Sequence, residues 1–196
     1  MRLHADQSLL LLIDFQSRLL PVIPEAEQGV REAGWLADIA RELGVPVWLT
    51  EQNPAQLGHT HPSLTKSRGR VWEKQHFSVT EEPGFLPALE KEGRRQVVVC
   101  GVEAHICVLQ SALGLLEAGF EVYWLVDATL SRRPFEATLA RQRAARQGAV
   151  SVSADMAAYE WLHRCDTPLF KRVHRQFLKP RVGRALTFIR DPAHDA

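Results

Sequence analysis

Three residues, Cys107, Asp14 and Lys74, have side chains and positions that could carry out covalent catalysis. Cys107 lies in the segment "CGVEAHICV", near the start of a predicted helix. Unpaired backbone N–H groups and the positive end of the helix dipole favour a thiolate there, and the thiolate is the nucleophilic form of cysteine. The same N–H groups can bind the oxyanion that forms when a thiolate attacks a carbonyl. A buried, inert cysteine is the alternative, and position alone does not decide between them.

Asp14 and Lys74 supply the groups that such a nucleophile needs. Asp14 ends the apolar segment "LLLLID", and Lys74 lies in "VWEKQHFS". A carboxylate beside a cysteine can accept its proton and later deliver it to a leaving amine. A nearby lysine stabilises both anions. Taken singly, Asp14 could be a cap or charge partner and Lys74 a solvated lysine, but together with Cys107 they predict a site for acyl transfer.

The order of apolar segments and helical patterns indicates how these residues meet. Strands are predicted over 8–14, 45–50, 70–74, 96–101, 121–128 and 148–153, and helices over 26–43, 86–92, 104–118, 134–147, 154–163 and 168–178. Because the strands are apolar on both faces and alternate with helices, we predict an α/β fold with a three-layer αβα, doubly wound, mainly parallel six-stranded sheet. If the fourth strand returns beside the first, a crevice opens at their carboxyl ends and brings Asp14 and Cys107 together.

The composition is that of an ordinary globular protein, and we expect a single domain over 1–196. Its core should span about 8–178, with a surface tail over 179–196. Hydrophobic residues make up 45% and charged residues 24%, and the formal net charge of +1 gives no overall field for nucleic acid or an acidic membrane. No apolar run approaches the ~20 residues that cross a bilayer, and no signal-peptide pattern opens the sequence, so we expect a cytoplasmic protein without such partners.

The segments "LLLIDFQ", "EKQHFS" and "CGVEAHICV" resemble, in order and spacing, those of the isochorismatase-like cysteine hydrolase family. "LVDATLSR" is similar to its fifth-strand segment, and the loop "TEQNPAQLGHT" resembles the isochorismatase-domain-containing subgroup. The resemblance implies a Rossmann-like isochorismatase fold and a homo-oligomer. It also implies a triad of Cys107, Asp14 and Lys74 that hydrolyses a small amide or related C–N bond through a covalent acyl-enzyme.

The resemblance also assigns supporting positions around this triad. The backbone N–H groups of Glu103 and Cys107 would form the oxyanion hole, with a cis peptide bond between Val102 and Glu103 although neither residue is proline. Such a bond costs ~3–4 kcal/mol and persists only where the surroundings hold it. The residues expected to shape the substrate pocket are Phe15, Gln16, Gln52, His76 and Phe77.

We expect no metal and no other cofactor. Nicotinamidases of this family carry an Asp-x-His metal motif after the second strand, where this sequence has Glu51, Gln52 and Asn53. His59 and His61 form a His-x-His pair, but on a polar loop they are expected to be solvated.

Three alternatives differ from the amidase in kind. One is a non-catalytic member that binds a metabolite or a partner protein in the crevice, and another is an isochorismatase-type hydrolase, which cleaves a vinyl ether without needing a cysteine. A nucleotide-binding module is disfavoured because "IDFQSRLL", rather than G-x-G-x-x-G, follows the first strand. If Cys107 is catalytic, we expect iodoacetamide to label it faster than Cys100 or Cys165, with an apparent pKa below ~8.5.

Overall fold

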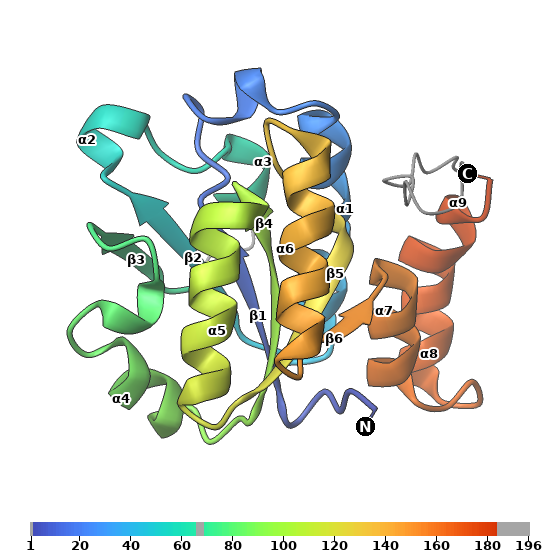
Figure 1. The fold of residues 1–196 in the computed structure, drawn as a ribbon. Helices are drawn as coiled ribbons and strands as arrows, with labels where there is room; N and C mark the ends of the chain where they lie inside the picture. Colours follow the sequence, from blue (N-terminus) through green and yellow to red (C-terminus); the bar gives the residue numbers. More distant parts are fainter. Residues whose placement is uncertain (1, 66–68, 184–196) are drawn as a thin grey trace.

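The chain forms one parallel sheet with helices on both faces, in a computed structural model that describes residues 2–65 and 69–183 (Figure 1). The strands are β1 (Ser8–Ile13), β2 (Val47–Gln52), β3 (Val71–Lys74), β4 (Gln96–Val102), β5 (Glu121–Leu130) and β6 (Val150–Val152). Their order in the sheet is β3-β2-β1-β4-β5-β6, and every neighbouring pair is parallel. This confirms the predicted doubly wound fold, including the return of β4 to lie beside β1.

Two layers of helices cover the sheet. The α-helices are α1 (Ala26–Glu42), α2 (Pro54–Leu57), α3 (Pro62–Thr65), α4 (Phe85–Lys91), α5 (Leu109–Glu117), α6 (Pro134–Arg146), α7 (Ala154–Leu162), α8 (Pro168–Val173) and α9 (Lys179–Arg181). Short 3₁₀ turns η1 (Leu20–Val22) and η2 (Val79–Glu81) and π-helical turns η3 (Ala104–Val108) and η4 (His174–Leu178) connect or extend them. Helices α4, α5 and α6 pack on one face, and α1 and α7 pack on the other. Within residues 2–65 and 69–183, no helix is both long and apolar enough to span a membrane.

The continuous apolar run of β1 is explained by its position between two cores. Side chains alternate across a strand, so Leu9 and Leu11 pack towards α4–α6 while Leu10 and Leu12 pack towards α1 and α7. All six residues of β1 are buried. A strand buried on both faces cannot show the polar alternation of a half-exposed one, and this is the pattern that predicts a central parallel strand.

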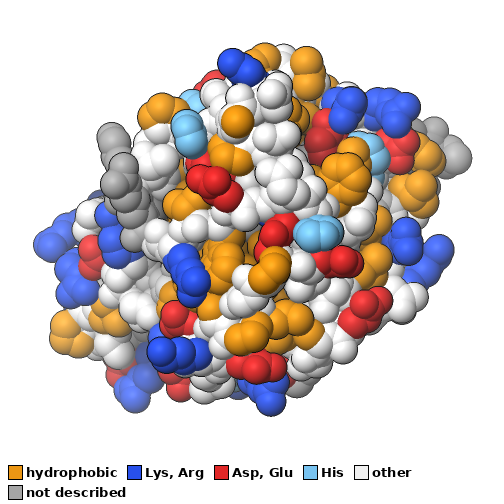
Figure 2. Space-filling model, turned by 90° about the vertical axis from the view of Figure 1, so that its left-hand side faces the viewer, with side chains coloured by type: hydrophobic (Ala, Val, Ile, Leu, Met, Phe, Trp, Pro, Cys, Tyr) orange, Lys and Arg blue, Asp and Glu red, His pale blue; other side chains and the backbone are white. Residues whose placement is uncertain are grey.

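The edge strand β3 lies on the side of the molecule that carries α2 and α4 (Figure 1). Figure 2 shows this face, where hydrophobic side chains gather between acidic and basic ones. Val71 of β3 and Phe77, just beyond its end, are 47% and 53% exposed. Exposed apolar side chains beside a strand edge are a surface that could meet another chain.

The first residues of the predicted surface tail include a buried arginine. Residues 179–181 form α9, and Arg181 is only 6% exposed. Its guanidinium forms an ion pair with Glu32 of α1, lies 3.0 Å from Asp155 and 3.6 Å from Asp127, and stacks 3.9 Å above the ring of Trp35. These partners come from α1, β5 and α7, so Arg181 ties α9 to three elements. Residues 184–196 of the predicted tail lie outside the described residues.

Replacing Arg181 with methionine is expected to lower the free energy of unfolding by about 3–5 kcal/mol, because the change removes one member of a buried ion pair. Methionine keeps much of the packing on Trp35. The matched control is Arg172→Met, since Arg172 pairs with Glu42 at 3.0 Å on the surface and such pairs contribute about 0–1 kcal/mol. Urea unfolding measures both variants. Equal losses of unfolding free energy in the two variants would show that the buried Arg181 pair stabilises the protein no more than the surface pair of Arg172.

Candidate active site

The predicted site residues are brought together by the ends of four neighbouring strands. Asp14 directly follows β1, and its backbone N–H donates to the carbonyl of Thr50 in β2 at 3.2 Å. Gln52 and Lys74 end β2 and β3 and face each other in register. Cys107 lies in the π-helical turn η3, which follows β4. Because β4 pairs with β1, the turn lies over the carboxyl end of β1, as the doubly wound topology requires.

Two backbone features permit this close arrangement. Gly101 has φ +156° and pairs with Ile13, and a Cβ atom at Gly101 would lie 2.1 Å from the carbonyl oxygen of Ile13. A larger residue there would push β4 away from β1. Asp14 has φ +53°, a left-handed conformation that aspartate tolerates better than most residues. This left-handed turn ends β1 at Ile13 and leaves the Asp14 carboxylate at the carboxyl end of the sheet, beside Lys74.

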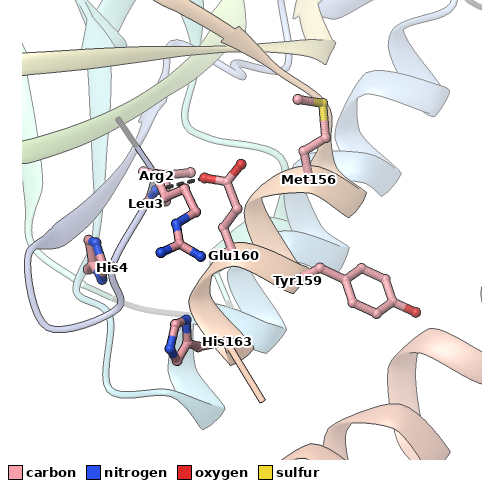
Figure 3. Close-up of a pocket in the computed structure, with 7 residues that line it drawn as sticks. All are labelled: Arg2, Leu3, His4, Met156, Tyr159, Glu160 and His163. Atoms are coloured by element: carbon pink, nitrogen blue, oxygen red, sulfur yellow. Dashed lines mark hydrogen bonds between the residues drawn. The ribbon is translucent and has the colours of Figure 1, made fainter. Parts of the chain in front are cut away.

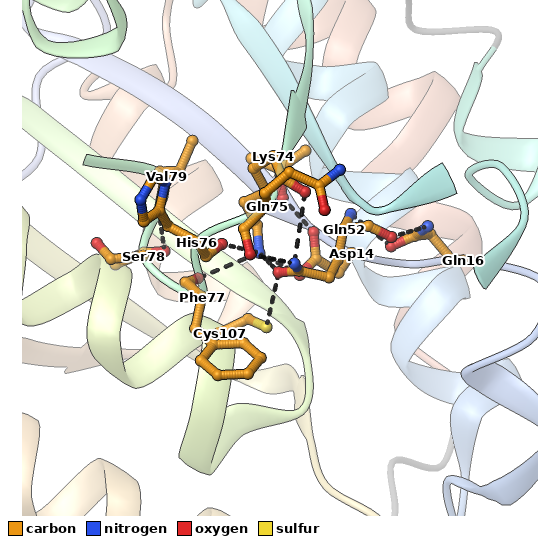
Figure 4. Close-up of polar contacts among 12 residues, drawn as sticks. Asp14, Gln16, Gln52, Lys74, Gln75, His76, Phe77, Ser78, Val79 and Cys107 are labelled. Carbon is orange, nitrogen blue, oxygen red and sulfur yellow. Dashed lines mark hydrogen bonds and ion pairs between the residues drawn. The ribbon is translucent and has the colours of Figure 1, made fainter. Parts of the chain in front are cut away.

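Asp14 and Lys74 form a fully buried ion pair (Figure 4). Lys74 Nζ lies 2.8 Å from Asp14 Oδ2, and the hydroxyl of Thr50 donates to Asp14 Oδ1 at 2.6 Å. The ammonium also donates to Gln52 Oε1 at 2.6 Å and to the carbonyl of Phe77 at 3.1 Å. Each charge therefore has a partner of opposite sign and further hydrogen bonds, which is what keeps charged groups stable in a buried site.

The thiol of Cys107 lies beside this pair and is 6% exposed. Sγ donates a hydrogen bond to Gln52 Oε1 at 3.8 Å. Burial, the largest cause, and the nearby Asp14 carboxylate together raise the pKa of Cys107 to about 12, against the opposing effect of the Lys74 ammonium. The expected lowering of this pKa is therefore wrong, because removal of the thiol from water outweighs the helix-start effect. At neutral pH the resting cysteine is a thiol, so a base must take its proton during attack.

Alkylation of Cys107 by iodoacetamide is expected to accelerate about tenfold per pH unit from about pH 7 to 10, without a plateau, because only the thiolate reacts. The exposed Cys165 is the internal control for the reagent, because it is labelled in the same sample. Mass spectrometry of the labelled peptides follows both residues in one sample. A Cys107 profile that levels off below pH 8.5 would contradict the raised pKa.

The turn that follows Lys74 carries His76 and Phe77, two of the predicted pocket residues, and both are exposed. Glu82 holds this turn, since its carboxylate accepts from the backbone N–H groups of Gln75 at 2.7 Å and His76 at 2.9 Å. Burial raises the pKa of Glu82, but the hydrogen bonds from His76 and Gln75 lower it more. The carbonyls of the same turn accept from Lys74. His76 and Phe77 thus lie at the surface, in the turn that follows the buried Lys74.

Phe15 and Gln16, two more of the predicted pocket residues, are both buried. Phe15 is 1% exposed and belongs to the core between the sheet and α1. Gln16 is fully buried, and its Nε2 donates to the carbonyls of Gln52 at 3.0 Å and Gly58 at 2.6 Å. The left-handed turn at Asp14 directs both side chains into the protein, which the sequence alone does not reveal, and their part in a substrate pocket stays a prediction.

The peptide bond between Val102 and Glu103 is trans, which corrects the expected cis bond. Residue 103 is not proline, and for such bonds the trans form is favoured by ~2.5–4 kcal/mol. The Glu103 side chain is 3% exposed and accepts from Arg132 Nε at 2.7 Å. The assignment of the oxyanion hole to the backbone N–H groups of Glu103 and Cys107 stays a prediction.

The two loop histidines have local partners. His59 Nδ1 lies 2.9 Å from the Glu51 carboxylate, and His61 Nδ1 lies 2.8 Å from the Ser63 hydroxyl. The bond to Glu51 raises the pKa of His59, although this side chain is 77% exposed. Over residues 2–65 and 69–183, no three His, Cys, Asp or Glu side chains gather as a set of metal ligands.

A separate cavity of about 260 Å³ lies near the opposite end of β1, between the segment before this strand and α7. Its lining residues are Arg2, Leu3, His4, Met156, Tyr159, Glu160 and His163 (Figure 3). The backbone N–H of Leu3 donates to Glu160 at 2.6 Å and fixes one wall. None of the predicted site residues lines this cavity.

Sequence reasoning placed Gln52 in the substrate pocket and did not foresee that it contacts both Lys74 and Cys107. It also missed Thr50 as a donor to Asp14. Both residues lie on the same face of β2, two positions apart, so strand periodicity together with the position of Asp14 could have found them.

Comparisons with known proteins show which family this chain resembles over most of its length. A family model described as the Isochorismatase domain matches residues 8–156. Isochorismatase domain-containing protein 2A of Mus musculus is 34% identical over 184 residues, which cover 91% of this chain and 86% of that protein.

Two solved structures have a similar fold. MAR1 ribonuclease from Caenorhabditis elegans is 31% identical with a TM-score of 0.85, covering 91% of this chain and 93% of that one. The YcaC gene product from Escherichia coli, an octameric hydrolase of unknown specificity, is 22% identical with a TM-score of 0.84, covering 92% of each chain, and shows the fold alone. The family model and the mouse relative both match most of this chain. The chain therefore belongs to the isochorismatase family.

Proposed function

We propose that this protein is a cysteine hydrolase that cleaves a small amide or related C–N bond through a covalent acyl-enzyme. The observation that carries the proposal is the buried ion pair of Asp14 and Lys74 beside the Cys107 thiol. Burying a carboxylate and an ammonium beside a thiol costs desolvation free energy, and titratable groups perturbed in this way cluster at functional sites. Membership in a family of hydrolases gives the same reaction class.

In the first half of the reaction, Cys107 Sγ attacks the carbonyl carbon of the substrate while its proton moves to Asp14. The backbone N–H groups of Glu103 and Cys107 stabilise the oxyanion of the tetrahedral intermediate. Asp14 then delivers the proton to the amine, the C–N bond breaks, and the acyl group stays on sulfur. Lys74 stabilises the carboxylate and the developing thiolate by its charge.

In the second half, water attacks the acyl-enzyme and gives its proton to Asp14. The C–S bond breaks, the acid leaves, and the proton returns to Cys107. The site therefore begins and ends with a neutral thiol, as the high pKa of Cys107 requires. A leaving amine needs a proton donor, and the carboxyl that has just taken the thiol proton is that donor, so the site has the group that amide cleavage requires.

The name of one similar protein suggests a second candidate activity. The Caenorhabditis elegans protein of the same fold is a MAR1 ribonuclease at 31% identity. RNA hydrolysis is therefore a rival that the test must include. The formal net charge of +1 offers little general attraction for a phosphate backbone.

A substrate panel separates these activities. It contains small primary amides, N-carbamoyl compounds, a vinyl ether of the isochorismate type and an RNA oligonucleotide, each with wild-type protein and Cys107→Ala. We expect amine release from a member of the first two classes and a matching acyl adduct on the Cys107 peptide in rapidly quenched samples. Cleavage of RNA or of the vinyl ether that persists in Cys107→Ala, with no amide turned over, would overturn the proposal.

We also propose that the protein forms a homo-oligomer. The Escherichia coli structure of the same fold is octameric, and Val71 of the edge strand β3 and Phe77 just beyond it are exposed. Phe77 follows Lys74 by three residues, so an interface there would lie near the site. Light scattering coupled to size-exclusion chromatography measures the state, and a monomer at micromolar concentration would contradict it.

A further inference from the structure

Gln52 places a neutral amide between the Lys74 ammonium and the Cys107 thiol (Figure 4). Its Oε1 accepts from Lys74 Nζ at 2.6 Å and from Cys107 Sγ at 3.8 Å. The side chain belongs to a residue that is 9% exposed, at the end of β2 and in register with Lys74. One oxygen therefore serves a charged donor and a thiol at the same time.

The orientation of this amide is fixed by its surroundings. Nε2 donates to the carbonyl of Gln75 at 2.9 Å and lies 3.4 Å from that of Lys74. The flipped amide would turn N–H groups towards an ammonium and an oxygen towards carbonyl oxygens, so it is disfavoured. Gln16 holds the backbone of Gln52 with two hydrogen bonds, one to its carbonyl at 3.0 Å and one from its N–H at 2.8 Å.

We propose that Gln52 is a positioning residue that keeps the Cys107 thiol protonated and holds Lys74 against Asp14 until substrate binds. The inference rests on the proposed cysteine hydrolase and adds a role that the triad alone does not contain. An amide oxygen accepts a hydrogen bond from S–H but is too weak a base to take the proton. A hydrogen bond to the neutral form favours that form, so Gln52 stabilises the thiol over the thiolate. The proton is then left for Asp14.

The same oxygen sets the position of the lysine. Lys74 has three donors, which are directed at Asp14, at Gln52 and at the carbonyls of the following turn. Without Oε1 the ammonium keeps Asp14 but loses one acceptor, and a Cys107 thiolate can take the vacant place because Lys74 already interacts with this cysteine. Loss of Gln52 therefore acts on the thiol twice in the same direction, by removing the acceptor of S–H and by freeing the ammonium to pair with sulfur.

Two substitutions at this position have opposite expected effects. Gln52→Met keeps length and approximate volume but removes the acceptor, so Cys107 should be alkylated about fivefold faster at pH 8, the effect of one hydrogen bond. Gln52→Glu is nearly isosteric and adds a negative charge, so alkylation should be about tenfold slower. Gln56→Met, on the exposed side of α2, is the matched control and should have the wild-type rate.

The measurement is the rate of iodoacetamide labelling of the Cys107 peptide from about pH 7 to 10, together with kcat and KM for an amide found in the panel. The hypothesis predicts faster labelling but lower kcat for Gln52→Met, because a loosened lysine no longer supports Asp14. A merely structural role would change both variants in one direction, and this result, or two profiles that superimpose on wild type, would overturn the inference.

Labelling does not depend on substrate, so the two proposals fail in different ways. If no amide is turned over but the two variants still shift labelling in opposite directions, the hydrolase proposal fails and the role of Gln52 stands for the thiol alone. Should Gln52→Met lose the circular dichroism spectrum of the folded protein, Gln52→Glu decides the question by itself, since it retains the acceptor for Lys74. Wild-type labelling in a folded Gln52→Glu variant then counts against the inference.

Discussion

Replacing Cys107 with alanine is expected to reduce amide hydrolysis by on the order of 10⁴-fold or more, because the atom that forms the acyl-enzyme is gone. The turn η3 and its packing should persist, since a change between two small side chains removes little buried volume. Circular dichroism and urea unfolding check that the variant stays folded. The acyl adduct seen with wild-type protein should disappear completely.

Two further variants make this result specific. Cys107→Ser keeps the shape and a hydroxyl, but an alcohol is far less acidic than a thiol, so it should be nearly as inactive as the alanine variant. Cys165→Ala removes an exposed cysteine outside the site and should leave kcat unchanged. If Cys107→Ala retained most of the activity, the covalent mechanism would be wrong and water would have to be the nucleophile.

The fold was predictable because its determinants are local and repetitive. Apolar runs without polar alternation, each followed by a helical pattern, leave few arrangements for a parallel sheet. The positions of Asp14 and Lys74 at the ends of such runs were readable for the same reason. The end of β2 was not: the strand was expected over 45–50, whereas it spans Val47–Gln52. Glu51 and Gln52 are polar but buried, so a hydrophobic pattern cannot show that they belong to a strand.

The parts of the site that the sequence did not reveal depend on burial and on distant contacts. The position of Cys107 in the sequence indicates a helix start but not its exclusion from water, which reverses the expected direction of its pKa shift. Arg181, near the end of the chain, is typical of a solvated tail. It is buried because Glu32, Asp127 and Asp155, which are far apart in the sequence, meet around it. Counter-charges of this kind have no sequence pattern.

Asp14→Asn is expected to reduce kcat by ~10²–10⁴-fold, since the amide keeps the shape of the side chain but cannot accept the thiol proton. Lys74→Met should reduce kcat as well, because it removes the charge that stabilises Asp14 and the thiolate. The labelling rates of Cys107 should move in opposite directions. Loss of the Asp14 charge lowers the pKa of the thiol and speeds alkylation, whereas loss of the Lys74 charge raises it and slows alkylation.

The double variant Asp14→Asn/Lys74→Met tests whether the two residues act as one unit. Its loss of kcat should be much smaller than the product of the two single losses, because a disabled proton relay cannot be disabled again. Stability gives an independent readout. Each single variant removes one member of a fully buried ion pair and should be destabilised by about 3–5 kcal/mol, while the double variant removes both charges and should recover part of that loss. Four proteins, measured by kcat and by urea unfolding, complete both cycles. Rate losses that simply multiply would mean that Asp14 and Lys74 serve separate steps, and the proton relay from Cys107 through Asp14 would need another basis.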